Sequence, residues 1–230
     1  MGFSVIILAA GQGTRMHSFK PKVLQLLAGR PLLHHVLMTA AQLKPAQTVI
    51  VCGYKGEMVQ QACKQFAIDW VWQTEQRGTG HAMQMAYPDL VAGNRVLVLY
   101  GDVPLVQADT LKKLLTQTPE DAIGILTAQV SDPSGLGRII RDQQQNIIEI
   151  VEARDANQEQ LAIDEINSGI YVLPYTHLAA WLSRLTAHNQ QQEYYLTDVP
   201  QILANDGETI AIHLCDDPRE VEGVNDRRQL

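Results

Sequence analysis

The sequence has few positive charges and no cluster of them. Its 230 residues include 18 Lys and Arg against 25 Asp and Glu, which gives a formal net charge of −7. Nucleic-acid-binding domains concentrate Lys and Arg on one face or in one segment, and no such segment occurs here. We therefore expect no nucleic-acid partner, and any anion-binding site has to obtain its positive charge locally from a few residues.

Cysteine is also scarce. Cys52, Cys63 and Cys215 stand far apart and form no Cys-x-x-Cys pair. Three scattered thiols do not make the disulfide framework of a secreted domain, and they suit a reducing compartment. Because free cysteine behaves as a small hydrophobic residue, we expect all three in the core.

Targeting and membrane-spanning segments are missing as well. The start "MGFSVIILAAG" is apolar but lacks the basic stretch of a signal peptide, and Ile6 stands where a myristoylation motif needs Ser or Thr. No apolar run approaches the roughly 20 residues of a transmembrane helix. These absences predict a cytoplasmic protein with no membrane partner.

Apolar segments alternate with amphipathic ones along the first half of the chain. Strands are expected at Val5–Ala9, Thr48–Val51, Trp70–Trp72, Arg95–Tyr100 and Ile123–Ala128, and helices at Pro31–Leu43, Glu57–Phe66, Thr79–Tyr87 and Ala108–Thr116. Strands that are apolar at nearly every position and separated by helices predict a mostly parallel sheet with helices on both faces. The predicted fold class is therefore α/β and Rossmann-like.

The pattern changes in the second half. The segments "LGRIIRD" (136–142) and "IIEIVEA" (147–153), joined by "QQQN", predict a β-hairpin added to the sheet. Helices are expected at 175–185 and 196–205, and a strand at 209–214. Since no linker, low-complexity tract or internal repeat interrupts the chain, we predict one domain, residues 1–230, whose C-terminal half completes a pocket.

The stretch "ILAAGQGTRM" (7–16) leaves the first strand and places glycines beside a cation. It does not match the P-loop GxxxxGK[ST]. The dinucleotide fingerprint GxGxxG needs a third glycine where Met16 stands, and an acidic residue after the second strand, where Cys52 and Gly53 follow Val51. Two common phosphate-binding loops are thereby excluded.

The remaining pattern is a pair of glycines, Gly11 and Gly13, followed by two cations, Arg15 and Lys22, the second of which comes after Pro21. Glycine lets backbone N–H groups approach a phosphate closely, and the two cations could flank a triphosphate. The pattern favours a nucleotide-phosphate site. The residues taken alone leave a second interpretation open, a tight turn with two solvated cations.

The stretch "LAAGQGTRM…PKVL" resembles the signature of the sugar-nucleotide pyrophosphorylases, which join a sugar 1-phosphate to a nucleoside triphosphate. Further motifs occur in the family's order: "QTEQRGTGHA" (73–82), "LYGDVPL" (99–105), "GLGRI" (135–139), "IVE" (150–152), "INSGIY" (166–171), "EYYLTD" (193–198) and "EVEGVNDRRQL" (220–230). The set is similar to the N-terminal uridyltransferase domains of the bifunctional N-acetylglucosamine-1-phosphate uridyltransferase/glucosamine-1-phosphate acetyltransferases. This resemblance covers essentially the whole chain.

The resemblance implies the nucleotide-diphospho-sugar transferase fold and a Mg²⁺-dependent reaction. UTP and N-acetylglucosamine 1-phosphate would give UDP-N-acetylglucosamine and pyrophosphate, by in-line attack of the sugar phosphate on the α-phosphorus. The product would feed peptidoglycan and lipopolysaccharide precursor synthesis. A phosphate monoester is already an anionic nucleophile, so the protein has to hold two polyanions together and neutralise the leaving group.

The resemblance also assigns site residues. Arg15 and Lys22 would be catalytic, and Asp102 and Asn225 would hold Mg²⁺. The nucleotide would contact Leu8, Ala9, Ala10, Gly11, Gly13, Lys22, Gln73, Gly78, Thr79, Tyr100, Gly101 and Asp102, and the sugar would contact Gly137, Glu152, Asn167 and Asn225.

The chemistry of single residues agrees with these assignments without requiring them. A carboxylate after a buried strand suits Mg²⁺, and the amide of Gln73 suits the imide edge of uracil. Each also has a structural interpretation: a helix cap for Asp102, a surface position for Gln73 and a turn for Asn225. His81 lies inside a helix-like stretch, and we expect it to be structural rather than a general base.

The chain departs from the family pattern at two positions and lacks one of its parts. Leu136 stands where relatives commonly have Tyr, and Gln12 where Lys is frequent, which we expect to alter affinity rather than reaction class. The bifunctional enzymes continue into a left-handed β-helix of hexapeptide repeats for acetyl transfer and trimerisation, and no such repeats occur here. We expect a single uridyltransferase domain that is monomeric or weakly associated.

Three other functions stay open at this point. They are a related pyrophosphorylase that uses another nucleoside triphosphate or hexose 1-phosphate, a nicotinamide dehydrogenase, and a non-catalytic nucleotide sensor. The missing third glycine and acidic residue argue against the dehydrogenase. A sensor would bind UTP without turnover.

Replacing Arg15 or Lys22 by Ala is expected to cost on the order of 2–4 kcal/mol in the transition state, as does the loss of one preorganised electrostatic donor. Both side chains are expected on a solvated loop, so the far-UV dichroism should not change. Steady-state kinetics and dichroism of the two variants check this. Unchanged activity, or a loss of the fold, would contradict the phosphate-site interpretation.

Overall fold

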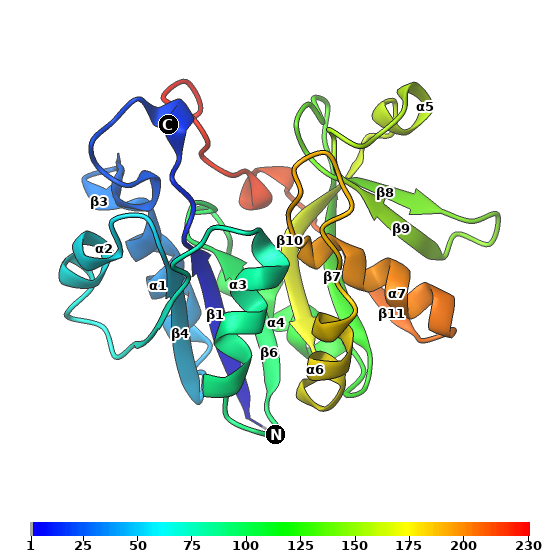
Figure 1. Ribbon diagram of the computed structural model, residues 1–230, viewed down its shortest axis with the longest axis horizontal. Coiled ribbons are helices and arrows are strands. Elements are labelled where there is room, and N and C mark those ends of the chain that lie inside the picture. Colours follow the sequence, from blue (N-terminus) through cyan, green and yellow to red (C-terminus); the bar gives the residue numbers. More distant parts are fainter. Residues whose placement is uncertain (1) are drawn as a thin grey trace.

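The computed structural model describes residues 2–230, and a nine-stranded sheet runs through it (Figure 1). The strands of this sheet are β1 (Phe3–Ala9), β4 (Gln47–Cys52), β5 (Asp69–Trp72), β6 (Arg95–Tyr100), β7 (Ile123–Gln129), β8 (Arg138–Arg141), β9 (Ile147–Val151), β10 (Glu165–Leu173) and β11 (Ile210–Leu214). A separate two-stranded ribbon pairs β2 (Leu26–Leu27) with β3 (Arg30–Pro31).

The main path of the sheet has the order β11-β7-β10-β6-β1-β4-β5. Strand β1 pairs in parallel with β4 and β6, β4 with β5, and β7 with β11. Strand β10 runs antiparallel to both β6 and β7. The predicted mostly parallel sheet is confirmed, and β10 is an antiparallel insertion whose direction the sequence analysis did not predict.

The predicted hairpin is confirmed. Strands β8 and β9 pair antiparallel, and Arg138 of β8 lies opposite Ile166 of β10. This single bridge joins the hairpin to the sheet beside the antiparallel strand. In Figure 1 the hairpin projects away from the sheet, on the side opposite β4.

Helices cover both faces of the sheet, as predicted. They are α1 (Leu32–Gln42), α2 (Gly56–Ala62), α3 (Thr79–Ala86), α4 (Ala108–Gln117), α5 (Gln158–Leu161), α6 (Tyr175–Ser183) and α7 (Val199–Asp206), with 3₁₀ turns at Thr14–Met16, Lys22–Leu24, Tyr87–Asp89, Leu196–Asp198 and Pro218–Val221. In Figure 1, α3 and α6 lie in front of the sheet, and α1 and α4 lie behind it.

Alternation along β1 divides the core into two halves. Val5 and Ile7 pack with the buried residues of α1, α2 and α4, whereas Ile6 and Leu8 pack with those of α3, α6 and α7. Every one of these four side chains is buried, as expected for a central parallel strand between two helical layers. The sheet therefore has apolar residues on both faces and presents its polar groups at the strand ends.

Several predicted boundaries differ from the structure. Helix α2 ends at Ala62 rather than at position 66, since Cys63 leaves the helical backbone with φ −107°. The helix predicted at 196–205 consists of a 3₁₀ turn followed by α7, with Pro200 in the first turn of α7, where its missing N–H costs no helical hydrogen bond. The short elements α5, β2 and β3 were not predicted.

The three cysteines are free and buried, as predicted. Burial raises the pKa of the Cys52 and Cys63 thiols to about 11, so both stay protonated and serve as packing groups. Within residues 2–230, no helix has the length and apolar character needed to cross a membrane.

The order of the strands reverses at β1. Strands β4 and β5 follow β1 on one side, whereas β6 lies on the other side. In open α/β sheets, ligands bind outside the carboxyl ends of the strands at such a switch point. The loops after β1 and β6 are therefore where a ligand site is expected.

A bulge in β10 shapes this edge of the sheet. The pairing of β10 with β7 shifts register between Asn167 and Tyr171. Gly169 lies in this segment with φ +78°, and a Cβ there would stand 2.6 Å from Cε2 of Tyr100. Only glycine allows the ring of Tyr100 to lie directly against the bulge.

Gly169→Ala is expected to lower the free energy of unfolding by about 2–4 kcal/mol, through left-handed backbone strain and overpacking against Tyr100. Gly207→Ala is the matched control, because Gly207 also has a positive φ of +73° but no atom within 4 Å of a built Cβ. The control should lose only about 1 kcal/mol. Urea unfolding measures both, and equal losses would contradict the steric part of the argument.

Candidate functional site

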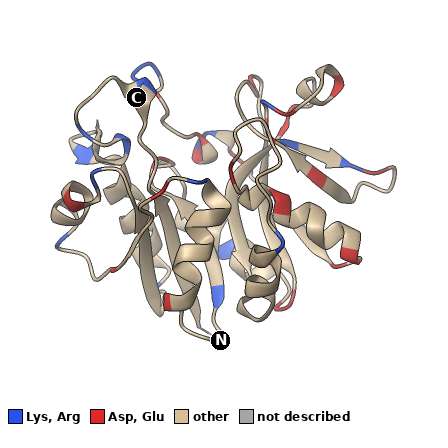
Figure 2. Cartoon of the chain, in the orientation of Figure 1, with Lys and Arg blue, Asp and Glu red and all other residues tan. Residues whose placement is uncertain are grey.

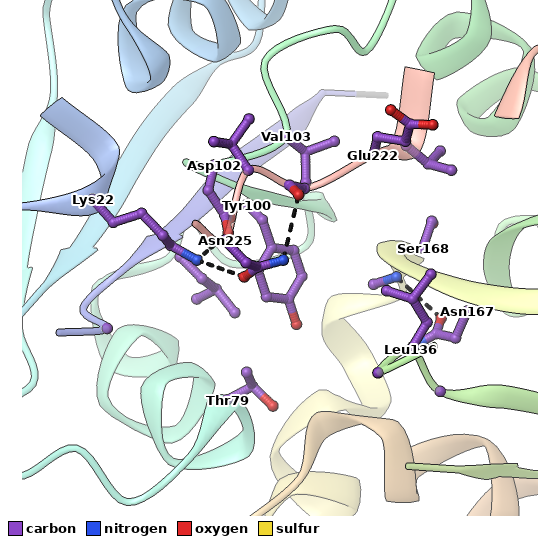
Figure 3. Close-up of a pocket in the computed structure, with 18 of the residues that line it drawn as sticks. Lys22, Thr79, Tyr100, Asp102, Val103, Leu136, Asn167, Ser168, Glu222 and Asn225 are labelled. Carbon is purple, nitrogen blue, oxygen red and sulfur yellow. Dashed lines mark hydrogen bonds and ion pairs between the residues drawn. The ribbon is translucent and has the colours of Figure 1, made fainter. Parts of the chain in front are cut away.

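A cavity of about 870 Å³ opens at the carboxyl ends of β1 and β6, between the sheet edge, the hairpin and the C-terminal segment. Most of the predicted site residues line it. These are Leu8, Ala9, Ala10, Gly11, Arg15, Lys22, Gln73, Gly78, Thr79, Tyr100, Asp102, Gly137, Glu152, Asn167 and Asn225. Folding thus brings together residues from positions 8 to 225, and Figure 3 shows several of them around the cavity.

Gly13 and Gly101 are the two predicted site residues that do not line the cavity. Gly13 has φ +62°, and a Cβ there would lie 2.5 Å from Cβ of Lys22. A Cβ at Gly101 would lie 3.1 Å from Val23 and 3.2 Å from Leu33. Both positions need glycine for packing within the protein. Their predicted approach to a nucleotide stays a prediction.

At one end of the cavity a lysine bridges two oxygens. Lys22 opens the 3₁₀ turn Lys22–Leu24, Asp102 follows β6, and Asn225 belongs to the C-terminal segment. The Lys22 ammonium forms an ion pair with Asp102 Oδ2 and donates to Asn225 Oδ1 at 3.0 Å (Figure 3). The side chain of Lys22 is only 16% exposed.

The prediction of a solvated loop is therefore wrong for Lys22, because the carboxylate and amide oxygens draw its ammonium into the cavity. Arg15 is exposed, as predicted. Asp102 does not cap the next helix either: α4 begins at Ala108, and its N-terminus has no side-chain cap. The helix-cap interpretation of Asp102 is thereby excluded.

Backbone hydrogen bonds hold the C-terminal segment against the end of β6. Val224 N donates to the carbonyl of Asp102 at 2.8 Å. Asn225 N donates to Gln229 Oε1 at 2.7 Å. The hydrogen bonds made by Val224, before Asn225, and by Gln229, after it, thus help to fix the position of the Asn225 side chain.

A second group of residues lies at the end of β5. Gln73 is 3% exposed, so it is not the surface glutamine of the alternative interpretation. Its Nε2 donates to the carbonyl of Gly78 at 2.9 Å. Thr79 begins α3, and its Oγ1 accepts from Leu196 N at 3.0 Å. Hydrogen bonds at Gln73 and at Thr79 therefore fix the turn between these two residues.

The third group comes from the hairpin and β10. Asn167 N donates to the carbonyl of Gly137 at 2.9 Å, and a Cβ on Gly137 would lie 3.7 Å from Glu152 Oε1. Asn167 Oδ1 accepts from Gly169 N at 3.1 Å, which leaves its Nδ2 as a donor. Thr197 Oγ1 donates to Glu152 Oε1 at 3.0 Å. Glu152 and Asn167 thus lie beside Gly137 in the same part of the cavity lining.

The two ends of the cavity differ in charge. Burial raises the pKa of Glu152, and burial together with the nearby Glu152 carboxylate raises the pKa of Asp198 to about 6. In Figure 2 segments with Lys and Arg gather on the loops beside the C-terminus, whereas acidic segments lie on β9 and α7, next to the arginines of β8. A phosphate is favoured at the Lys22 end, and neutral hydroxyl groups at the Glu152 end.

Two residues that the sequence analysis did not single out support this site. Thr197 orients Glu152, as described above. Arg227 donates from Nε to the carbonyl of Met16 at 2.9 Å and from Nη2 to that of His17 at 3.0 Å. His17 has the left-handed φ of 45°. No sequence signal indicates that a side chain reaches back across 211 positions.

A mostly parallel sheet with a glycine-containing turn, a lysine and a carboxylate at its carboxyl edge defines a nucleotide-binding α/β enzyme. Residues 5–195 match the family described as the MobA-like NTP transferase domain, and the chain belongs to this family. It is a nucleotidyltransferase.

Curated relatives match along the whole chain. The bifunctional protein GlmU of Acinetobacter baylyi is 52% identical over 230 residues, which are 100% of this chain and 50% of the relative. That of a Psychrobacter species is 50% identical over 227 residues, 99% of this chain and 50% of the relative. The chain therefore spans about half the length of the curated relatives it matches, and it is homologous to their N-terminal half.

Solved structures show the same fold at low identity. A nucleotidyl transferase from Methanothermobacter superimposes with a TM-score of 0.71 at 14% identity, covering 99% of this chain and 94% of the other. At this identity, the similarity shows the fold alone.

Arg227→Ala is expected to weaken nucleoside triphosphate binding by about tenfold. Hydrogen bonds from a charged donor contribute about 1.5–3 kcal/mol, and these two hold the turn that carries Arg15. Arg228→Ala is the matched control, because only its backbone N–H forms a hydrogen bond in residues 2–230. Calorimetric titration with a nucleoside triphosphate measures both variants.

The double variant Arg227→Ala, His17→Gly should recover part of the affinity, since glycine adopts the left-handed conformation without strain. Equal binding by Arg227→Ala and Arg228→Ala would contradict the role of Arg227.

Proposed function

We propose that this chain is a uridyltransferase that forms UDP-N-acetylglucosamine and pyrophosphate from UTP and N-acetylglucosamine 1-phosphate. One observation carries the proposal: a single cavity has the Lys22–Asp102–Asn225 cluster at one end and Gly137, Glu152 and Asn167 at the other. Similarity to bifunctional GlmU proteins along the whole chain supports it.

In this proposal the charged ends of the cavity orient the substrates. Lys22 and the exposed Arg15 neutralise the phosphates as an oxygen of the sugar phosphate attacks the α-phosphorus of UTP and pyrophosphate leaves. The Glu152 carboxylate accepts hydrogen bonds from sugar hydroxyls, and Asn167 Nδ2 donates to the acetamido carbonyl. Gln73 faces the uracil.

Membership in this family indicates a divalent metal. No group of three or more His, Cys, Asp or Glu residues in the described part of the chain could hold one. Asp102 and Asn225 nevertheless fit such an ion, because their two hard oxygens converge on one cation, the Lys22 ammonium. We propose that they hold Mg²⁺, which takes its other ligands from water and substrate phosphates. When bound, it would supply charge neutralisation at the phosphates.

We also propose a cellular setting for the domain. We propose that residues 1–230 work as one domain in the cytosol, where the free thiols stay reduced. The product is an activated amino sugar of the kind consumed in peptidoglycan and lipopolysaccharide synthesis. The monomeric or weakly associated state stays a prediction.

The test is pyrophosphate release from UTP and N-acetylglucosamine 1-phosphate with Mg²⁺. Turnover with this pair should greatly exceed that with glucose 1-phosphate, because glucose 1-phosphate has no acetamido group for Asn167. Equal rates with both sugars would overturn the sugar assignment and leave the reaction class standing. UTP binding without pyrophosphate release would favour the nucleotide sensor.

Asp102→Asn is expected to nearly abolish turnover, because it removes the only carboxylate of the proposed metal site. Asn225→Ala removes a neutral oxygen and should raise the Mg²⁺ concentration for half-maximal rate. The control is Asn205→Ala on the exposed surface of α7. Rate against Mg²⁺ is measured for all three, and an unchanged Mg²⁺ dependence in Asn225→Ala would remove that residue from the site.

A further inference from the structure

His81 is a hydrogen-bond partner of the cavity residue Gln73. It lies in the first turns of α3, does not line the cavity, and has its Nδ1 3.1 Å from Gln73 Nε2. The carbonyl of Gly78 lies 2.9 Å from the same nitrogen. The proposed reaction needs no general base from this histidine.

These contacts fix the orientation of the Gln73 amide. A carbonyl oxygen can only accept, so the nitrogen of the amide, and not its oxygen, has to face Gly78. The second hydrogen of that nitrogen then points to His81 Nδ1, which accepts it when the histidine carries its proton on Nε2. Both donors of the amide are used within the protein, and only Oε1 is left to meet a ligand.

The backbone of Gln73 is held as firmly as its side chain. Its N–H donates to the carbonyl of Cys52 at 2.8 Å, and its carbonyl accepts from Gln76 Nε2 at 3.2 Å. Since Gln73 is 3% exposed, little water can replace these partners. The amide thus presents a fixed acceptor at the cavity wall.

We propose that His81 is a specificity-determining positioning residue for the base. By holding the Gln73 amide with Oε1 toward the cavity, it makes the site select a base with an N3–H donor, which uracil and thymine have and cytosine lacks. The inference rests on the proposed uridyltransferase function and deepens it. Cytosine presents an unprotonated N3, and two acceptors facing each other cannot form a hydrogen bond.

The experiment compares kcat/KM for UTP and CTP in the wild type and two His81 variants. In His81→Asn the side-chain oxygen stands near the position of Nδ1 and keeps the acceptor, whereas His81→Gln places its polar groups one atom farther and loses it. His81→Gln should lower the UTP/CTP ratio about fivefold, the weight of one hydrogen bond. His81→Asn should keep the ratio, and so should the control His177→Gln, on the exposed face of α6.

Three results would overturn the proposal, and only one of them also overturns the proposed nucleotide class. If His81→Gln loses activity equally on UTP and CTP, His81 only supports the structure and the proposal is overturned. If the wild type uses CTP as well as UTP, the proposed nucleotide class fails and the role of His81 fails with it. A UTP-selective wild type with an unchanged ratio in His81→Gln overturns the proposal alone.

A second measurement does not depend on a variant that folds. Nitrogen-15 spectra of the imidazole rings report which nitrogen of His81 carries the proton, and through-bond correlation with the backbone of the wild type assigns the signal. The proton is expected on Nε2, with Nδ1 as the acceptor. A proton on Nδ1 would make that atom a donor facing another donor, which overturns the proposal.

Discussion

One ammonium group joins three distant parts of the chain. Lys22, from the loop after the first strand, contacts the carboxylate of Asp102 and the amide oxygen of Asn225, so the start, the middle and the end of the chain meet at one point. In a protein of net charge −7, Lys22 places one positive charge between these two oxygens. The shape of this end of the cavity depends on the contact.

The rest of the site is built from rigid elements around that point. Parallel strands β1 and β6 end side by side, the antiparallel β10 adds the wall that carries Asn167, and the β8–β9 segment adds Glu152. Separate elements thus carry the Lys22 end and the Glu152 end of the cavity. This separation allows a cationic end and an acidic end to coexist in one cavity without forming a mutual ion pair.

Hydrogen bonds within the protein orient the polar side chains that line the cavity. Thr197 orients Glu152, Gly169 N orients the amide of Asn167, and Gly78 with His81 orients that of Gln73. In each case an inner partner occupies one side of a polar group and leaves the other side for a ligand. Three of these partners, Thr197, Gly169 and Gly78, line the cavity themselves, whereas His81 acts on Gln73 without lining it.

Local and periodic features follow from the order of the residues alone. Apolar strands alternating with amphipathic helices, the hairpin, the burial of the cysteines and the failure of two common phosphate-loop patterns all depend on neighbouring residues. The family motifs also placed most of the cavity residues, because most of these motifs lie within or next to strands whose ends form the cavity edge.

Which groups meet, and how they are oriented, depends on how the chain folds. The antiparallel direction of β10, the burial of Lys22, and the packing roles of Gly13 and Gly101 depend on contacts between segments far apart in the chain. The same holds for Arg227 reaching Met16, and for the amide of Gln73 held between Gly78 and His81. Residue order fixes the alternation of elements, but the direction of a hydrogen bond is set by its partner, and that partner is known only once the chain has folded.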